Sequence, residues 1–230
     1  MRPPSRRRLL RATAAVLAAP LLPARGQAPG TPAPLTIALA PFLSPAALLQ
    51  AFRGLREHLE RALARPVEMV TARDFRTLCE ATRAQRHDAV MLPAHLARLA
   101  ADDWGHHVLA ATIDALQVLV LVRRDSPARN PADLRGASVG MLDSLSLTAT
   151  VGRLWLQEQG LEGSVKVVTV PSINSALFAL DRGEVAAVVC GSTQLLNLPP
   201  STPRSERVLA TLRDIPGPIY LARKDLPAAD

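Results

Sequence analysis

Aromatic side chains are scarce in this chain of 230 residues, where Phe, Trp and Tyr make up 3% of the sequence. Proteins that bind single-stranded nucleic acid stack bases on aromatic rings, so this scarcity argues against that class. The sequence also has no Cys-x-x-Cys pair of metal ligands, no phosphate-cradling glycine loop and no Gly-x-Ser-x-Gly elbow between a strand and a helix. It therefore gives no support for a metal centre, a nucleotide site or a serine hydrolase.

Acidic residues are absent from the first 28 positions, which contain six arginines. Of the 27 lysine and arginine residues, the 21 that remain face 20 acidic residues, so the rest of the chain is nearly neutral. The net charge of +7 therefore does not indicate nucleic-acid binding. The apolar stretch at residues 12–22 is broken by Pro20 and is shorter than the about 20 residues that a membrane span needs.

A charged start, a short apolar run and small residues after it are typical of an export signal. We therefore predict that residues 1–28 direct export, that residues 29–34 form a linker and that the mature protein is periplasmic. Residues 5–11 resemble a twin-arginine signal, with an ordinary arginine-rich secretory signal as the alternative.

Cysteine occurs twice, at Cys79 and Cys190. Export would permit a disulfide between them. Cys79 falls on a predicted helix, however, and Cys190 at the end of a predicted strand far along the chain. We therefore favour two buried free thiols over a disulfide.

Strands and helices alternate in the first half of the chain. The predicted strands are residues 36–40, 67–70 and 89–92, and the predicted helices that follow them begin at Ser44, Asp74 and Pro93. After Ser44, apolar residues recur at helical spacing as one stripe, made of Leu48, Phe52, Leu55, Leu59 and Leu63. Such alternation favours a parallel sheet with helices on its faces.

The second half repeats this alternation after an apolar run at residues 118–122, which is typical of a strand covered on both faces. Predicted strands follow at residues 138–142, 165–170, 185–189, 208–212 and 219–223, with predicted helices at 146–159 and 172–182. We predict an α/β fold of two lobes that form a clamshell, each lobe a mainly parallel sheet flanked by helices. The predicted first lobe comprises residues 35–116 and 208–230, and the second comprises residues 117–207.

Polar residues follow the carboxyl ends of several predicted strands, where the ligand lies in open α/β sheets. Helix starts at these places offer free N–H groups and a partial positive charge, which attract anions. The candidate ligand-binding residues are Phe42, Ser44, His95, Ser146, Thr148, Ser172, Asn174 and Ser192. Each has a plainer interpretation: Ser172 as a helix cap, Ser146 and Thr148 as first-turn residues, and His95 as a surface histidine.

Three segments resemble the solute-binding proteins of ABC transporters that take phosphate, phosphite or phosphonate. They are Asp88–His95 (DAVMLPAH), Leu142–Thr148 (LDSLSLT) and Ser172–Leu177 (SINSAL). The resemblance implies a type 2 periplasmic-binding fold and delivery of an anion to a membrane permease. It also implies that Ser146, Thr148 and Ser172 bond the anion while Phe42 and His95 close over it from the first lobe.

The sequence departs from this family at several of those positions. Leu147 stands where the family has Thr, Ile173 where it has His, and His95 where it has Tyr. Gly191 and Ser192 occupy the place of an acid that would bind an ammonium group, which argues against aminoalkylphosphonate ligands. Ala186 likewise replaces an Asp of the family pattern.

We therefore predict an exported, monomeric protein that captures a small oxyanion between its lobes and passes it to an ABC permease. No cofactor, metal ion or nucleic acid is expected. The alternatives are a periplasmic sensor domain that acts on a membrane signalling partner and, with less support, a hydrolase that uses serine and histidine side chains.

Overall fold

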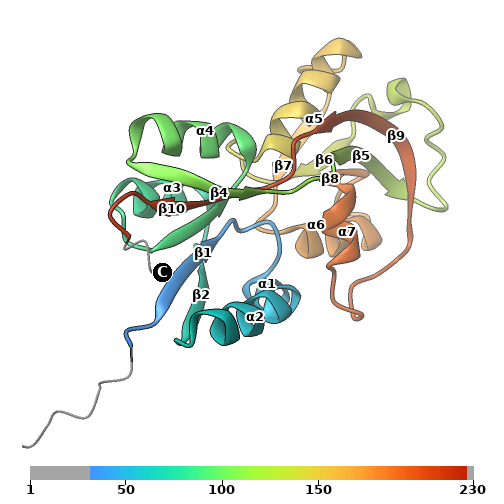
Figure 1. Ribbon diagram of the computed structural model, residues 1–230. Helices are drawn as coiled ribbons and strands as arrows, with labels where there is room; N and C mark the ends of the chain where they lie inside the picture. The colour runs from blue at the N-terminus through green and yellow to red at the C-terminus, as the bar shows by residue number, and fades with distance from the viewer. Residues whose placement is uncertain (1–31, 227–230) are drawn as a thin grey trace, which may run out of the picture. The chain divides into compact units, whose positions relative to one another are not determined.

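The computed structural model describes residues 32–226, all within one compact unit, and Figure 1 shows their helices and strands. The predicted export signal, residues 29–31 of the predicted linker and residues 227–230 lie outside this described part. The described residues form two sheets of five strands, each flanked by helices. This arrangement confirms the predicted α/β class and its two lobes.

The first sheet has the strand order β2-β1-β3-β10-β4, and only β10 runs against its neighbours. Its strands are β1 (Leu35–Leu39), β2 (Val67–Thr71), β3 (Ala89–Leu92), β4 (His106–Ala111) and β10 (Ile219–Arg223). In Figure 1, two helices lie on one side of this sheet and two on the other: α1 (Pro45–Ala51) and α2 (Arg53–Leu63), then α3 (Phe75–Arg83) and α4 (Ala94–Asp103).

The second sheet has the matching order β7-β6-β8-β5-β9, and only β5 runs against its neighbours. Its strands are β5 (Leu116–Arg123), β6 (Ser138–Met141), β7 (Lys166–Thr169), β8 (Ala187–Gly191) and β9 (Glu206–Ile215). Its helices are α5 (Leu147–Glu158) on one face, and α6 (Ile173–Asp181) and α7 (Ser192–Leu196) on the other (Figure 1). A short 3₁₀ helix at Pro131–Leu134 precedes β6.

Strand β9 differs from our expectation, which placed residues 208–212 in the first lobe. It pairs antiparallel with β5 in the second sheet, from Leu116 opposite Ile215 to Arg123 opposite Glu206. The physical reason is packing, because apolar residues of β9 such as Leu209 and Leu212 contact the core of the second lobe. Only β10, beyond Gly217, crosses back to the first sheet.

The predicted helix after Ser44 is also interrupted. It divides into α1 and α2 at Phe52, whose backbone (φ −95°, ψ 6°) is not helical. Leu48 is fully buried, whereas the rest of the predicted stripe packs against the core only partly buried. The apolar pattern is therefore real, but it is shared by two shorter helices.

Strand β5 is covered on both faces, as its unbroken apolar sequence predicts. Val118, Val120 and Val122 face a core cluster that includes residues of α5. Leu119 and Leu121 face the opposite way, into a cluster that contains α6 and also the core of the first lobe. The two lobes thus share one continuous apolar core on the α6 side of the second sheet.

Both cysteines are free thiols, which confirms the preference over a disulfide. Cys190 is completely buried in the shared core, and burial raises the pKa of its thiol to about 12. Cys79 on α3 is only partly buried, so the expectation of full burial is wrong for this residue.

Two helical glycines give a matched test of the packing between α5 and the second sheet. A Cβ at Gly152 would lie 2.9 Å from a methyl of Val189, whereas a Cβ at Gly54 on α2 meets nothing within 4 Å. We expect Gly152→Ala to lower the free energy of unfolding by about 1–3 kcal/mol, because the strand residue cannot move aside. Gly54→Ala should raise it by about 0.5–1 kcal/mol through helix propensity alone.

Urea unfolding followed by circular dichroism would measure both changes. Equal stabilisation by the two substitutions would contradict the close packing of Gly152 against β8.

Candidate ligand-binding site

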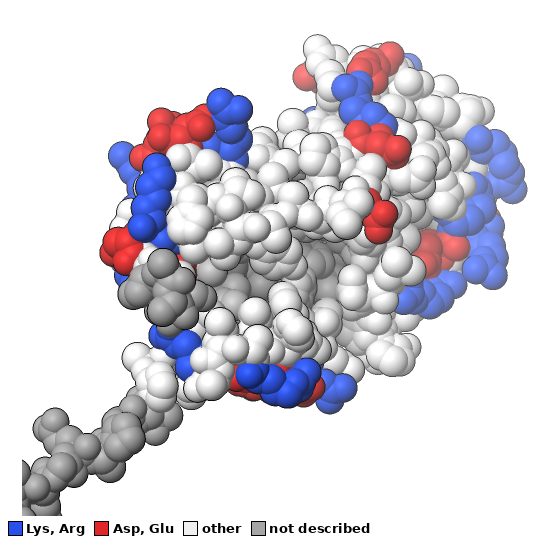
Figure 2. All heavy atoms as spheres, in the orientation of Figure 1, with Lys and Arg blue, Asp and Glu red and all other residues white. Residues whose placement is uncertain are grey.

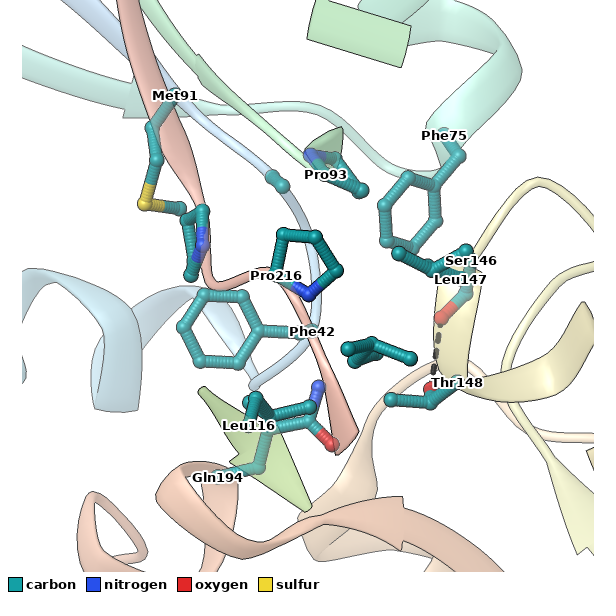
Figure 3. Close-up of a pocket in the computed structure, with 13 residues that line it drawn as sticks. Phe42, Phe75, Met91, Pro93, Leu116, Ser146, Leu147, Thr148, Gln194 and Pro216 are labelled. Carbon is teal, nitrogen blue, oxygen red and sulfur yellow. Dashed lines mark hydrogen bonds between the residues drawn. The ribbon is translucent and has the colours of Figure 1, made fainter. Parts of the chain in front are cut away.

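A cavity of about 60 Å³ lies between the two lobes, and Figure 3 shows the residues around it. The first lobe contributes Ala40, Phe42, Phe75, Met91 and Pro93. The second lobe contributes Ser146, Leu147, Thr148 and Gln194, and the connections between the lobes contribute Leu116, Ile215, Pro216 and Pro218. These residues follow the carboxyl ends of β1, β3, β6 and β8, which is where open α/β sheets place a ligand.

The two connections between the lobes run side by side and form part of the cavity wall. Thr112, just after β4, donates to the carbonyl oxygen of Pro218 from its backbone N–H (3.2 Å) and its hydroxyl (2.8 Å). Gly217 permits this approach, since a Cβ there would lie 2.7 Å from the Cβ of Thr112. The two connections therefore join the lobes and also border the cavity.

Ser146 and Thr148 bring two hydroxyls to the cavity from the first turn of α5. They are 3% and 5% exposed, and their oxygens lie 2.9 Å apart in a mutual hydrogen bond (Figure 3). Ser146 occupies the N-cap position of α5 but makes no side-chain cap bond. One hydroxyl hydrogen and the first N–H groups of the helix therefore remain for another acceptor.

Phe42 lies in the middle of the cavity wall in Figure 3, as expected from the sequence. Its ring packs edge to face on Phe52, with centroids 6.5 Å apart and planes at 74°. This contact fixes the loop after β1 against the break between α1 and α2.

Ser44 and Asn174 do not line the cavity; they join the lobes beside it. The Ser44 N–H donates to Asn174 Oδ1 (3.0 Å), and Asn174 Nδ2 donates to Ser44 Oγ (2.9 Å). Next to this pair, the Ile173 N–H donates to the carbonyl oxygen of Phe42 (3.1 Å). Three hydrogen bonds thus hold the start of α6 against the loop after β1.

Ser172 and Ser192 have local partners and also lie outside the cavity lining. Ser172 Oγ accepts the N–H of Ser175 (3.2 Å), so it is a helix cap, which is the plainer of the two interpretations. Ser192 Oγ accepts the N–H of Gln117 (3.2 Å) and ties α7 to β5.

His95 is exposed near the start of α4 and is likewise not part of the cavity lining. Partial burial of the imidazole lowers the pKa of His95. A hydrogen bond with the backbone of Leu145, in the other lobe, acts in the opposite direction and raises it. The lowered pKa favours the neutral form of the imidazole.

Gln194 lines the cavity, although we did not include it among the candidate residues. It is 7% exposed and lies in the first turn of α7, two residues after Ser192. The only sequence signal for it is its place near the end of β8, two residues after the candidate Ser192.

No charged side chain lines the cavity within residues 32–226. On the face drawn in Figure 2, most Lys, Arg, Asp and Glu residues lie toward the edges, and the middle is largely uncharged. Within the described residues, no cluster of His, Cys, Asp and Glu could hold a metal ion, and no helix is long and apolar enough to cross a membrane.

The sequence pattern Gly-x-Ser-x-Gly does occur at residues 136–140, but the fold does not use it as a nucleophile elbow. Its serine, Ser138, begins β6 and pairs with Lys166 of β7. A nucleophile elbow requires the serine at a turn from a strand into a helix.

Residues 37–230 match the family model described as the phosphonate-type periplasmic substrate-binding protein of ABC transporters. The chain belongs to this family. It is therefore a member of a family of periplasmic solute-binding proteins, as the motifs in residues 88–177 indicate. No curated protein matches it in sequence.

Solved structures agree with the family's fold. The binding-protein component of an ABC phosphonate transporter from Pseudomonas aeruginosa is similar with a TM-score of 0.75 at 15% identity, covering 85% of this chain and 70% of that one. PhnD1 from Prochlorococcus marinus, in complex with methylphosphonate, gives a TM-score of 0.72 at 14% identity, covering 84% and 77%. The aliphatic sulphonate binding protein SsuA from Escherichia coli gives a TM-score of 0.53 at 18% identity, covering 84% and 62%.

Two positions at which the family resemblance leads us to expect polar residues carry apolar side chains here. Leu147, which stands in place of Thr, is part of the cavity wall. Ile173, which stands in place of His, is completely buried in the core shared by the lobes. Ile173 is therefore a structural contact between the lobes.

The Ser44–Asn174 pair can be tested by a double-mutant cycle. We expect Asn174→Ala to lower the free energy of unfolding by about 1–3 kcal/mol, because it leaves the Ser44 N–H without its acceptor. Combined with Ser44→Ala, the loss should be smaller than the sum of the single losses by at least about 0.5 kcal/mol.

Asn197→Ala is the matched control, since this exposed amide bonds only the carbonyl oxygen of Thr193 within its own helix. It should change stability by no more than about 0.5 kcal/mol. Strict additivity of Ser44→Ala and Asn174→Ala in chemical denaturation would refute the contact between the lobes.

Proposed function

We propose that the protein captures a small oxyanion in the cavity between its lobes and delivers it to an ABC permease. The single observation that carries this proposal is the group of buried donors at the start of α5. There the buried hydroxyls of Ser146 and Thr148 bond one another beside the cavity, on the first turn of a helix whose first N–H groups have no partner within the helix. A helix start carries about half a positive charge, which stabilises a bound anion without a charged side chain.

The size and polarity of the cavity restrict the ligand further. A volume of about 60 Å³ admits a ligand of only a few heavy atoms. Because no lysine, arginine or charged histidine lines the wall, an anion of low charge is favoured over a multiply charged one. Phosphonate monoanions, phosphite, sulfonates and short carboxylates fit this description.

The proposal also covers export, delivery to the permease, the oligomeric state and the need for a cofactor. Residues 1–28 would carry the chain across the inner membrane, and the bound lobes would present the anion to the permease. One copy of the chain supplies both walls of the cavity, so a monomer is sufficient for capture. No cofactor is needed, because binding and release involve no chemical change in the ligand.

A thermal-unfolding screen of phosphate, phosphite, phosphonates, sulfonates and carboxylates tests the ligand class. We expect at least one of these anions to stabilise the mature protein, by about 2.7 kcal/mol at 100 times its dissociation constant. If none raises the unfolding temperature at millimolar concentration while an uncharged solute does, the oxyanion proposal is wrong.

The donor group can be tested by removing both hydroxyls. We expect the double variant Ser146→Ala, Thr148→Ala to weaken binding of the selected anion at least about tenfold in calorimetry, which corresponds to about 1.4 kcal/mol. Thr150→Ala is the control, because Thr150 lies on the exposed side of the same helix and bonds only backbone oxygens. Equal affinity of the double variant and the wild type would remove these hydroxyls from the site.

A further inference from the structure

The side chain of Gln194 has a fixed orientation at the cavity. Its Oε1 accepts the N–H of Gly191 at 2.8 Å, so the oxygen end of the amide is held toward the backbone at the end of β8. No side chain or backbone group within residues 32–226 accepts a hydrogen bond from Nε2. The part of the amide left for a ligand is therefore the NH₂ group, which can only donate.

Gln194 faces the cavity from a different side than the hydroxyls of α5. In Figure 3 its amide lies beside Leu116, across the cavity from Ser146 and Thr148. A ligand in this small space would meet donors from both sides. The walls between them are apolar, formed by residues such as Phe42 and Pro216.

Within residues 32–226, no carboxylate lines the cavity to compensate the charge of an ammonium group, although the hydroxyl oxygens of Ser146 and Thr148 can accept a hydrogen bond. Such a group needs acceptors, and burying it without a carboxylate costs several kcal/mol. Gly191 cannot be replaced by a larger acidic residue without rearrangement, because a Cβ there would lie 2.6 Å from a methyl of Leu116. Of the residues at the end of β8, only Gln194 reaches the cavity.

We propose that Gln194 is a specificity residue that donates to an oxygen of the ligand and excludes ligands that carry an ammonium group. The proposal rests on the proposed function, because it concerns the same cavity. It commits the protein to small oxyanions that carry no ammonium group.

The test uses three pairs of probes that differ by one ammonium group: acetate and glycine, methylphosphonate and aminomethylphosphonate, ethanesulfonate and taurine. For each pair bound by the wild type, calorimetry should show at least tenfold tighter binding of the member without nitrogen. Gln194→Glu should shift this ratio at least tenfold toward the amine, because a glutamate can still accept the Gly191 N–H and then offers a carboxylate to the ammonium group.

Asn197→Asp is the matched control, since it adds the same charge three residues along the chain at an exposed position. It should leave every ratio unchanged. Should Gln194→Glu fail to fold, Gln194→Met keeps the length of the side chain but removes both the NH₂ donor and the oxygen that accepts the Gly191 N–H. It should weaken binding of the nitrogen-free member about tenfold and bind the amine no better.

The outcomes separate the two proposals. If the wild type binds both members of a pair equally, or if Gln194→Glu leaves the ratios unchanged, the specificity role of Gln194 is wrong and the oxyanion site stands. If the wild type binds no probe in any pair and none of the anions in the thermal screen, the proposed function itself fails, and the role of Gln194 fails with it.

Discussion

The contact between the start of α6 and the loop after β1 is the constraint on which the rest of the structure depends. Ile173, Asn174 and Ser44 supply it through three hydrogen bonds and a fully buried side chain. Each hydrogen bond contributes only about 0.5–1.5 kcal/mol net, but the apolar core that continues past them adds to the effect. Together with the shared core and the Thr112–Pro218 hydrogen bonds, this contact holds the strand ends of the two sheets toward one another around the cavity.

The cavity that results is neutral and poor in acceptors. An anion that enters it exchanges water for hydroxyls, helix N–H groups and one amide, with no ion pair to compensate for lost hydration. Under the proposed function, such a site would select ligands of low charge and small size, and would discriminate by the presence of an ammonium group. Leu147, Pro216 and Pro218 contribute to its apolar wall.

Much of the fold could be predicted from the sequence because apolar strands and amphipathic helices have clear periods. The run at residues 118–122 identified a strand buried on both faces, and β5 is such a strand. The partner of β9 could not be predicted, because strand pairing depends on tertiary packing and residues 208–212 carry no signal for one sheet over the other. The break at Phe52 depends on its ring packing against Phe42, a contact between two elements.

The candidate site also combines features that could be predicted from the sequence with features that could not. Ser146 and Ser172 are alike in sequence, each a serine at the start of a helix after a strand. Ser172 caps its own helix, whereas Ser146 turns to Thr148 and the cavity. Sequence position could not separate them, because the choice depends on which neighbouring groups are within reach in the folded chain. Gln194 was missed because a glutamine in a helical turn has no pattern that marks it as a ligand residue.

A crystal structure of the complex with the anion selected by thermal screening tests the central claim most directly. The account predicts density for the anion between the lobes, with its oxygens within hydrogen-bond distance of Ser146, Thr148 and Gln194 and with the Ser44–Asn174 pair intact. An anion bound to arginine side chains at the surface, with the cavity holding only water, would contradict it.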